Sequence, residues 1–66
     1  MRHWLRDARQ AKGLSQEETA KRTGVSQSTY AMWETGTRTP TVETAKRIAD
    51  VLGFSWTRFF DDEEVR

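Results

Sequence analysis

The chain has 66 residues, a formal net charge of +1 and no cysteine. This length allows one domain near the lower limit for folding without cross-links, and the lack of cysteine excludes disulfides and thiolate metal sites. No apolar run approaches the roughly 20 residues that span a bilayer, and the N-terminus lacks the apolar stretch of a signal peptide, so we expect a cytoplasmic protein.

Helix signals recur along the chain, whereas the alternating pattern of a strand is absent. Apolar residues at helical spacing predict a first helix over residues 4–12, which Gly13 ends. Ser15 and Glu18 form a capping-box pattern, which predicts a second, short helix that stops at Gly24.

Three further helices follow in the same way. Ser26 is the expected cap of a third helix that ends near Thr35. After a loop that contains Pro40, Thr41 is the expected cap of a fourth helix with an apolar stripe. The segment WTRFF predicts a short fifth helix. The predicted fold class is therefore all-α, with five helices around one core.

The charges divide unevenly between a body and a tail. Residues 1–60 hold ten of the eleven basic residues but only six of the ten acidic ones. We expect one domain over residues 1–60, with a mildly basic surface that is compatible with nucleic-acid binding. Residues 61–66 are expected to form an acidic C-terminal tail that frays.

The third predicted helix has two unlike faces. At about 100° per residue, Tyr30 and Trp33 share an arc that can bury a large apolar area. The opposite arc holds only uncharged side chains, namely Gln27, Ser28, Ala31, Met32 and Thr35. Exposed helix faces ordinarily carry charges, so this arc suits the major groove, where base edges offer donors, acceptors and thymine methyls. An ordinary small-residue surface patch explains the arc equally well.

The spacing of the second and third helices decides between these two interpretations. Two short helices joined by a tight turn at Gly24, with the small Ala20 at their crossing, predict a helix-turn-helix whose second helix enters the groove. With its GLSQEET, GVS and ETGTRTPT motifs, the sequence over residues 5–55 resembles the helix-turn-helix domain of the phage-repressor and Cro family, also called Xre-like.

The resemblance implies a compact five-helix, repressor-like domain that contains a helix-turn-helix in helices 2 and 3. It implies a sequence-specific transcriptional regulator that binds double-stranded DNA as a homodimer over operator half-sites, and a repressor that acts by occupying its operator. It implies no small-molecule cofactor.

The resemblance also implies base-reading roles for residues of the third helix. Gln27 is expected to bond adenine, and the single hydroxyl of Ser28 to select less strongly. Met32 matches a third reader that covers a thymine methyl, with a solvent-exposed gap-filling role as the alternative. Ala31 is near enough to contribute.

Phosphate contacts are implied for a second group of residues. Gln16 stands at the start of the second helix, where the family's glutamine contacts a phosphate and braces the first residue of the recognition helix, here Gln27. Arg38, with the hydroxyls of Thr37 and Thr39, lies in the loop that serves the family as a backbone clamp.

Structural roles are implied for other positions. Arg9 and Glu34 resemble a partly buried ion pair that orients the recognition helix, with two independent surface charges as the alternative. Thr19 and Thr23 replace the family's usual leucines, so either their methyls are half buried or the helix pair packs loosely. Trp56 is a candidate dimer contact, a role that the sequence leaves open.

Two other classes of function compete with DNA binding. An enzyme needs positioned groups in a pocket, and the chain has no cysteine and a single histidine, His3, near one end. We therefore expect no catalytic residue and no metal site. A protein-interaction module, such as an antitoxin-type partner, uses the same fold. Gln16, Gln27 and Arg38 favour DNA, because a pure adaptor has no need of all three.

Overall fold

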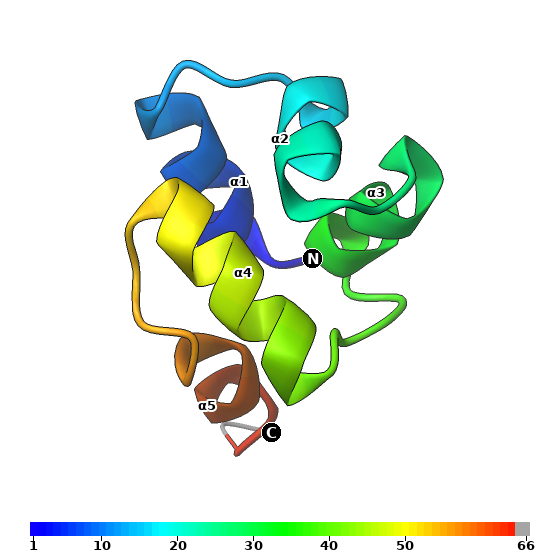
Figure 1. The fold of residues 1–66 in the computed structure, drawn as a ribbon. Helices are drawn as coiled ribbons and strands as arrows, with labels where there is room; N and C mark the ends of the chain where they lie inside the picture. The colour runs from blue at the N-terminus through cyan, green and yellow to red at the C-terminus, as the bar shows by residue number, and fades with distance from the viewer. Residues whose placement is uncertain (65–66) are drawn as a thin grey trace.

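The computed structural model describes the backbone of residues 1–64 and the side chains of residues 1–61. Its helices are α1 (His3–Ala11), α2 (Gln16–Thr23), α3 (Gln27–Thr35), α4 (Val42–Leu52) and α5 (Arg58–Glu64). The described residues contain no strand, and none of their helices is long and apolar enough to cross a membrane. The predicted all-α fold with five helices is confirmed. In Figure 1, α2 and α3 lie at one end of the molecule and α5 at the other.

The ends of α2 and α3 follow from the residues that stand there. The Ser15 hydroxyl accepts the Glu18 N–H at 3.0 Å, and the Glu18 carboxylate accepts the Ser15 N–H at 3.2 Å, which completes the predicted capping box. Gly24 ends α2 with φ of 78°, a left-handed conformation that favours glycine. Ser26 then caps α3, so α2 and α3 are joined by a short, tight turn.

The core takes apolar side chains from every helix, including Leu5, Ala20, Tyr30, Trp33, Ala45, Ile48, Leu52 and Phe59. Trp4 packs edge-on against Phe54 and Phe59, with ring centroids 5.1 Å apart in both pairs. Tyr30 and Trp33 meet edge-on at 6.0 Å. The aromatic arc of α3 is therefore buried, and this burial fixes which face of the helix points outward.

Thr19 and Thr23 belong to the core and are 0% and 2% exposed. The Thr19 hydroxyl donates to the Ser15 carbonyl, and the Thr23 hydroxyl donates to the carbonyls of Thr19 and Ala20. Since the helix's own carbonyls satisfy both hydroxyls, the methyls can pack as apolar groups where α2 meets α3 and α4. Of the two alternatives, buried methyls are correct, and the burial is complete.

The C-terminal part of the chain differs from expectation. The fifth helix begins at Arg58 instead of Trp56 and continues to Glu64, so residues 61–64 are helical where a frayed tail was expected. Asp61 donates its N–H to the Thr57 carbonyl and stands in the first turn, where the helix dipole favours a carboxylate. The remainder of the expected tail, residues 65–66, lies outside the described residues.

Paired substitutions at Thr23 separate the contributions of its methyl and its hydroxyl. Thr23→Ser removes the buried methyl and should lower the free energy of unfolding by about 1 kcal/mol. Thr23→Val should change it by less than about 0.5 kcal/mol, because the Ala20 carbonyl keeps its bond from the Val25 N–H. Urea unfolding followed by circular dichroism measures both. A larger loss in Thr23→Val than in Thr23→Ser would show that the hydroxyl dominates.

Candidate nucleic-acid interface

The uncharged arc of α3 faces outward. Gln27 and Ser28, in its first turn, are exposed, and Thr35 at its end is exposed as well. Ala31 and Met32 are half-buried, so each presents only part of its side chain. The structure therefore places the four predicted base readers on one face of α3. Of these, Gln27 and Ser28 are the most exposed.

This outward face carries no ionised side chain. Glu34 is the only acidic residue of α3, the helix has no basic residue, and the Glu34 side chain is 1% exposed. A solvent-facing helix ordinarily carries Lys, Glu or Arg for solubility. The exposed surface of α3 consists instead of an amide, hydroxyls, a methyl and a thioether.

Glu34 ties α3 to the two helices before it. Arg9 of α1 donates from Nε to Glu34 Oε2 at 2.6 Å and from Nη1 to the Leu14 carbonyl at 2.8 Å. Gln16 of α2 donates from Nε2 to Glu34 Oε1 at 3.0 Å. Arg9 and Glu34 thus form an ion pair and are not independent surface charges.

Burial and hydrogen bonds shift the pKa values of Glu34 and Tyr30 in this cluster. Burial works to raise the pKa of Glu34, but hydrogen bonds, above all from Arg9, bring that pKa below its usual value. The pKa of Tyr30 is raised, first by burial and then by the Glu34 carboxylate. The Tyr30 hydroxyl is buried and interacts with this carboxylate, although no hydrogen bond of ordinary geometry joins them. The cluster therefore favours an ionised Glu34 and a neutral Tyr30.

Gln16 lies differently from what the resemblance implies. Its amide was expected to face Gln27, but it points inward to Glu34, and among the described residues no hydrogen bond joins the two glutamines. The reason lies in the geometry of Arg9, whose Nη2 approaches Glu34 Oε1 only to 3.5 Å. This oxygen is poorly satisfied by the arginine and accepts the Gln16 amide instead.

The α3–α4 loop holds the three other predicted phosphate contacts at the end of α3. Thr37, Arg38 and Thr39 are all exposed. The Thr37 hydroxyl lies 2.9 Å from that of Thr35, and the Thr39 hydroxyl accepts from Arg2 Nη2 at 2.7 Å. Both threonine hydroxyls are thus already engaged within the protein, and the Arg38 side chain is the charged group that this loop presents.

Arg2 is a residue of this region that sequence reasoning missed. It is 6% exposed and donates to backbone groups of both α3 and the loop. A charged residue just before a first helix is ordinarily solvated, so its type and position predict no such role. The one available signal is indirect. α3 has no basic residue in its last turn, which leaves its terminal carbonyls in need of an outside donor.

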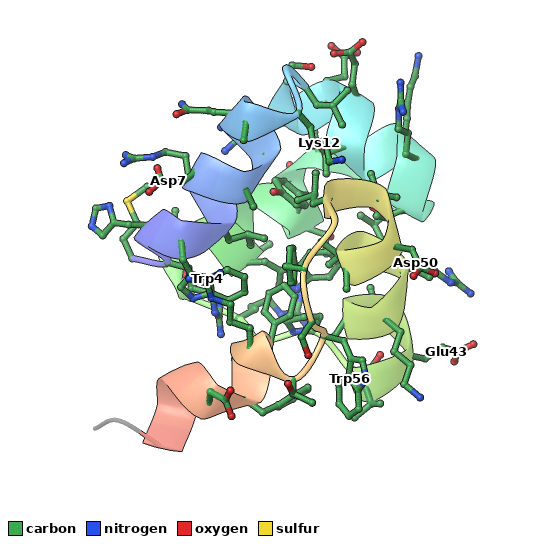
Figure 2. All side chains as sticks on the ribbon, turned by 90° about the vertical axis from the view of Figure 1, so that its left-hand side faces the viewer. Trp4, Asp7, Lys12, Glu43, Asp50 and Trp56 are labelled. Atoms are coloured by element: carbon green, nitrogen blue, oxygen red, sulfur yellow. The ribbon has the colours of Figure 1, made fainter. Side chains whose placement is uncertain are left out.

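Trp56 lies far from this interface along the chain and is half-buried. Its ring packs edge-on against Phe60 at 5.9 Å, and the Lys46 ammonium group lies 5.1 Å from its centroid. Figure 2 shows Trp56 beside the part of α4 that carries Glu43. Part of the ring therefore covers α4 and α5 of its own chain, and only the remainder faces outward.

Known proteins resemble most of this chain in sequence. A family model described as helix-turn-helix matches residues 5–59. The chain is 48% identical over 62 residues to an uncharacterised HTH-type transcriptional regulator, YqaF, of Bacillus subtilis, covering 94% of this chain and 82% of that protein. It is 37% identical over 61 residues to the cryptic phage CTXphi transcriptional repressor RstR of Vibrio cholerae, covering 92% of this chain and 55% of the repressor.

A solved structure matches as well. It is the crystal structure of an HTH_3 family transcriptional regulator from Vibrio cholerae, with a TM-score of 0.70 and 38% sequence identity. The match covers 88% of this chain but 33% of that regulator. The chain thus spans most of YqaF, about half of RstR and a third of the solved regulator.

Glu34→Gln should weaken the fold and change its response to acid. Removing the charge leaves the half-buried Arg9 guanidinium without its charged partner, which we expect to lower the free energy of unfolding at pH 7 by about 3 kcal/mol. Because the folded pKa of Glu34 is lowered, its contribution is present above the unfolded pKa of about 4.3 and is lost as pH falls through the folded pKa.

Urea unfolding of parent and variant between pH 7 and pH 2 measures this difference, with the exposed Glu17→Gln as the matched control. The stability gap between parent and Glu34→Gln should narrow at low pH, whereas the control should stay within about 1 kcal/mol of the parent. A gap that is independent of pH would show that the charge of Glu34 is not responsible.

Tyr30→Phe should change the response to alkali. The folded pKa of Tyr30 is raised, so its contribution to stability is complete below the unfolded pKa of about 10 and falls as pH rises above it. The phenylalanine variant has no hydroxyl to ionise. Between pH 9 and pH 11 its free energy of unfolding should therefore fall less than that of the parent in the same assay. An identical alkaline decline in both proteins would contradict this account.

Proposed function

The chain belongs to the helix-turn-helix family, and from this premise we propose that it is a DNA-binding transcriptional regulator that places α3 in the major groove. We propose further that it binds specific operator sequences and represses by occupying them. The regulator named RstR is a repressor, which supports this choice. No enzymatic activity and no cofactor form part of the proposal.

One observation carries the proposal. The exposed face of α3 has no charged side chain, and contacts on the buried side of α3 fix the helix in place. The aromatic side of α3 is buried, and its one carboxylate is tied to α1 and α2. The helix is therefore fixed before any ligand arrives, which reduces the ordering that binding requires. Short neutral donors, acceptors and methyls are the groups that read base edges.

The proposed base readers divide by exposure. Gln27 is exposed, and its amide can bond adenine N6 and N7 together, a contact worth about 1–3 kcal/mol of discrimination. Ser28 is also exposed and can bond either class of base. Met32 and Ala31 are half-buried and offer apolar contact to a thymine methyl from less exposed positions.

Phosphate contacts are proposed for residues on either side of this face. Arg38 supplies the charge, and the Thr37 and Thr39 hydroxyls can accompany it only by sharing or exchanging their present partners. Gln16 uses one N–H on Glu34, and its amide has a second N–H that can donate to a phosphate. Bracing of Gln27 by Gln16 would require the amide to turn from Glu34.

We propose that the protein works as a homodimer over two half-sites in the cytoplasm. Residues 1–60 read too few base pairs for useful affinity alone, and family members pair over half-sites about 34 Å apart. The exposed part of Trp56 is the proposed dimer contact, though much of its ring already packs on its own chain.

Binding to DNA can be tested by fluorescence anisotropy with a random-sequence duplex as salt is raised from low to physiological concentration. The affinity should fall steeply with salt, because bound phosphates release their counterions. An operator is then selected from the same pool. No binding at low salt would contradict the proposal and would favour a protein partner for the same face of α3.

Gln27→Ala and Arg38→Ala should differ in kind on the selected operator. Gln27→Ala should lose about 1–3 kcal/mol of preference at one base pair, while Arg38→Ala should weaken all sequences alike and reduce the salt slope by about one. The control is Gln10→Ala, an exposed glutamine of α1. Loss of base preference in Arg38→Ala, or none in Gln27→Ala, would overturn these assignments.

A further inference from the structure

Arg2 joins two parts of the chain that lie more than 30 residues away from it. Its backbone N–H donates to the Glu34 carbonyl at 2.7 Å, and its Nη1 donates to the carbonyls of Trp33 at 2.6 Å and Arg38 at 2.9 Å. Its Nη2 donates to the Thr39 hydroxyl at 2.7 Å. Figure 1 shows the N-terminus beside α3, and the bonds to Trp33 and Glu34 place Arg2 at the end of that helix, although it precedes the helix-turn-helix in the sequence.

At the end of α3, Arg2 satisfies groups that the helix cannot satisfy itself. The last four carbonyls of a helix have no partner within it. In α3 the Met32 carbonyl accepts from the N–H groups of Gly36 and the two residues that follow it, whereas Trp33 and Glu34 accept from Arg2. The guanidinium also brings a positive charge to a C-terminal turn that has none of its own, which the helix dipole favours.

In the α3–α4 loop, the same guanidinium holds the backbone from which the proposed phosphate contacts extend. It binds the Arg38 carbonyl and the Thr39 hydroxyl while it also binds the Trp33 carbonyl of the helix. One planar group thus sets the position of the loop relative to α3. Its position is in turn limited by the Phe59 ring, 5.5 Å away in the core.

We propose that Arg2 is a positioning residue for DNA binding, which holds the α3–α4 loop in the arrangement that brings Arg38 to a phosphate. Arg2 is buried and acts through Arg38 without touching DNA itself. Fixing the loop in advance lowers the ordering cost of the phosphate contact. This inference rests on the proposed function and adds a residue from outside the helix-turn-helix to it.

The test compares Arg2→Met with Arg6→Met, a matched control on α1 whose guanidinium pairs with the adjacent Asp7 at 3.5 Å. Affinity for the selected operator is measured at a temperature where circular dichroism shows all proteins folded. Arg2→Met should bind on the order of tenfold more weakly, with a smaller salt slope and an unchanged preference for the base read by Gln27. Arg6→Met should bind like the parent.

A double-mutant cycle shows whether Arg2 acts through Arg38. If it does, Arg2→Met combined with Arg38→Ala should bind only slightly more weakly than either single variant, since both remove the same contact. A merely structural role for Arg2 would leave the two losses independent, and they would multiply. Independent losses, or parental affinity in Arg2→Met, would overturn the inference while leaving the proposed function standing.

A variant that does not fold and a parent that does not bind DNA have different consequences. If Arg2→Met does not fold, Arg2→Lys decides by the same cycle, because it keeps the charge but offers a single nitrogen that cannot span helix and loop as a guanidinium does. It should give an intermediate loss that is again coupled to Arg38→Ala. If the parent itself fails to bind DNA at low salt, the proposed function fails and this role of Arg2 fails with it.

Discussion

The attachment of α3 to α1 and α2 depends on a single buried carboxylate. Glu34 of α3 accepts a short hydrogen bond from Arg9 of α1 on Oε2 and one from Gln16 of α2 on Oε1. Its side chain is almost completely buried. A buried ion pair adds little net stability, since desolvation offsets the attraction. The pair instead fixes the orientation of α3 relative to α1 and α2. The bonds to the carboxylate come from α1 and α2, so they hold three helices in one arrangement, in which the buried Tyr30 and Trp33 leave the neutral face of α3 outward.

Local signals in the sequence were sufficient to predict the helices and their core. Ser15 with Glu18, Ser26 and the left-handed Gly24 act within one or two turns, so their effects follow from nearby residues alone. The burial of Tyr30 and Trp33 follows from their helical spacing in the same way. The helix bounds agree closely until α5, where Asp61 joins the first turn of a helix and does not begin a frayed tail.

Contacts between distant segments were harder to predict. The family resemblance implies that Gln16 faces Gln27, and neither it nor the residue pattern shows that one oxygen of Glu34 is left for a second donor. Thr19 and Thr23 are polar residue types, and their burial is explained by the hydrogen bonds that their hydroxyls donate to backbone carbonyls one turn earlier. For Arg2 the sequence holds only the indirect signal that α3 lacks a basic residue in its last turn, since the partners of Arg2 lie more than 30 residues away along the chain.

The exposure of Gln27 and Ser28 has a consequence for how such a protein can diverge. Neither side chain belongs to the core, and the contacts that set the position of α3 are made by other residues. On the proposed function, substitutions at these two positions alter the base preference with little effect on folding. Changes at Glu34 cannot, because three helices depend on it. If the proposed function holds, a duplicated gene can acquire a new operator through a few surface substitutions, whereas the buried contacts of Glu34 restrict changes in the interior.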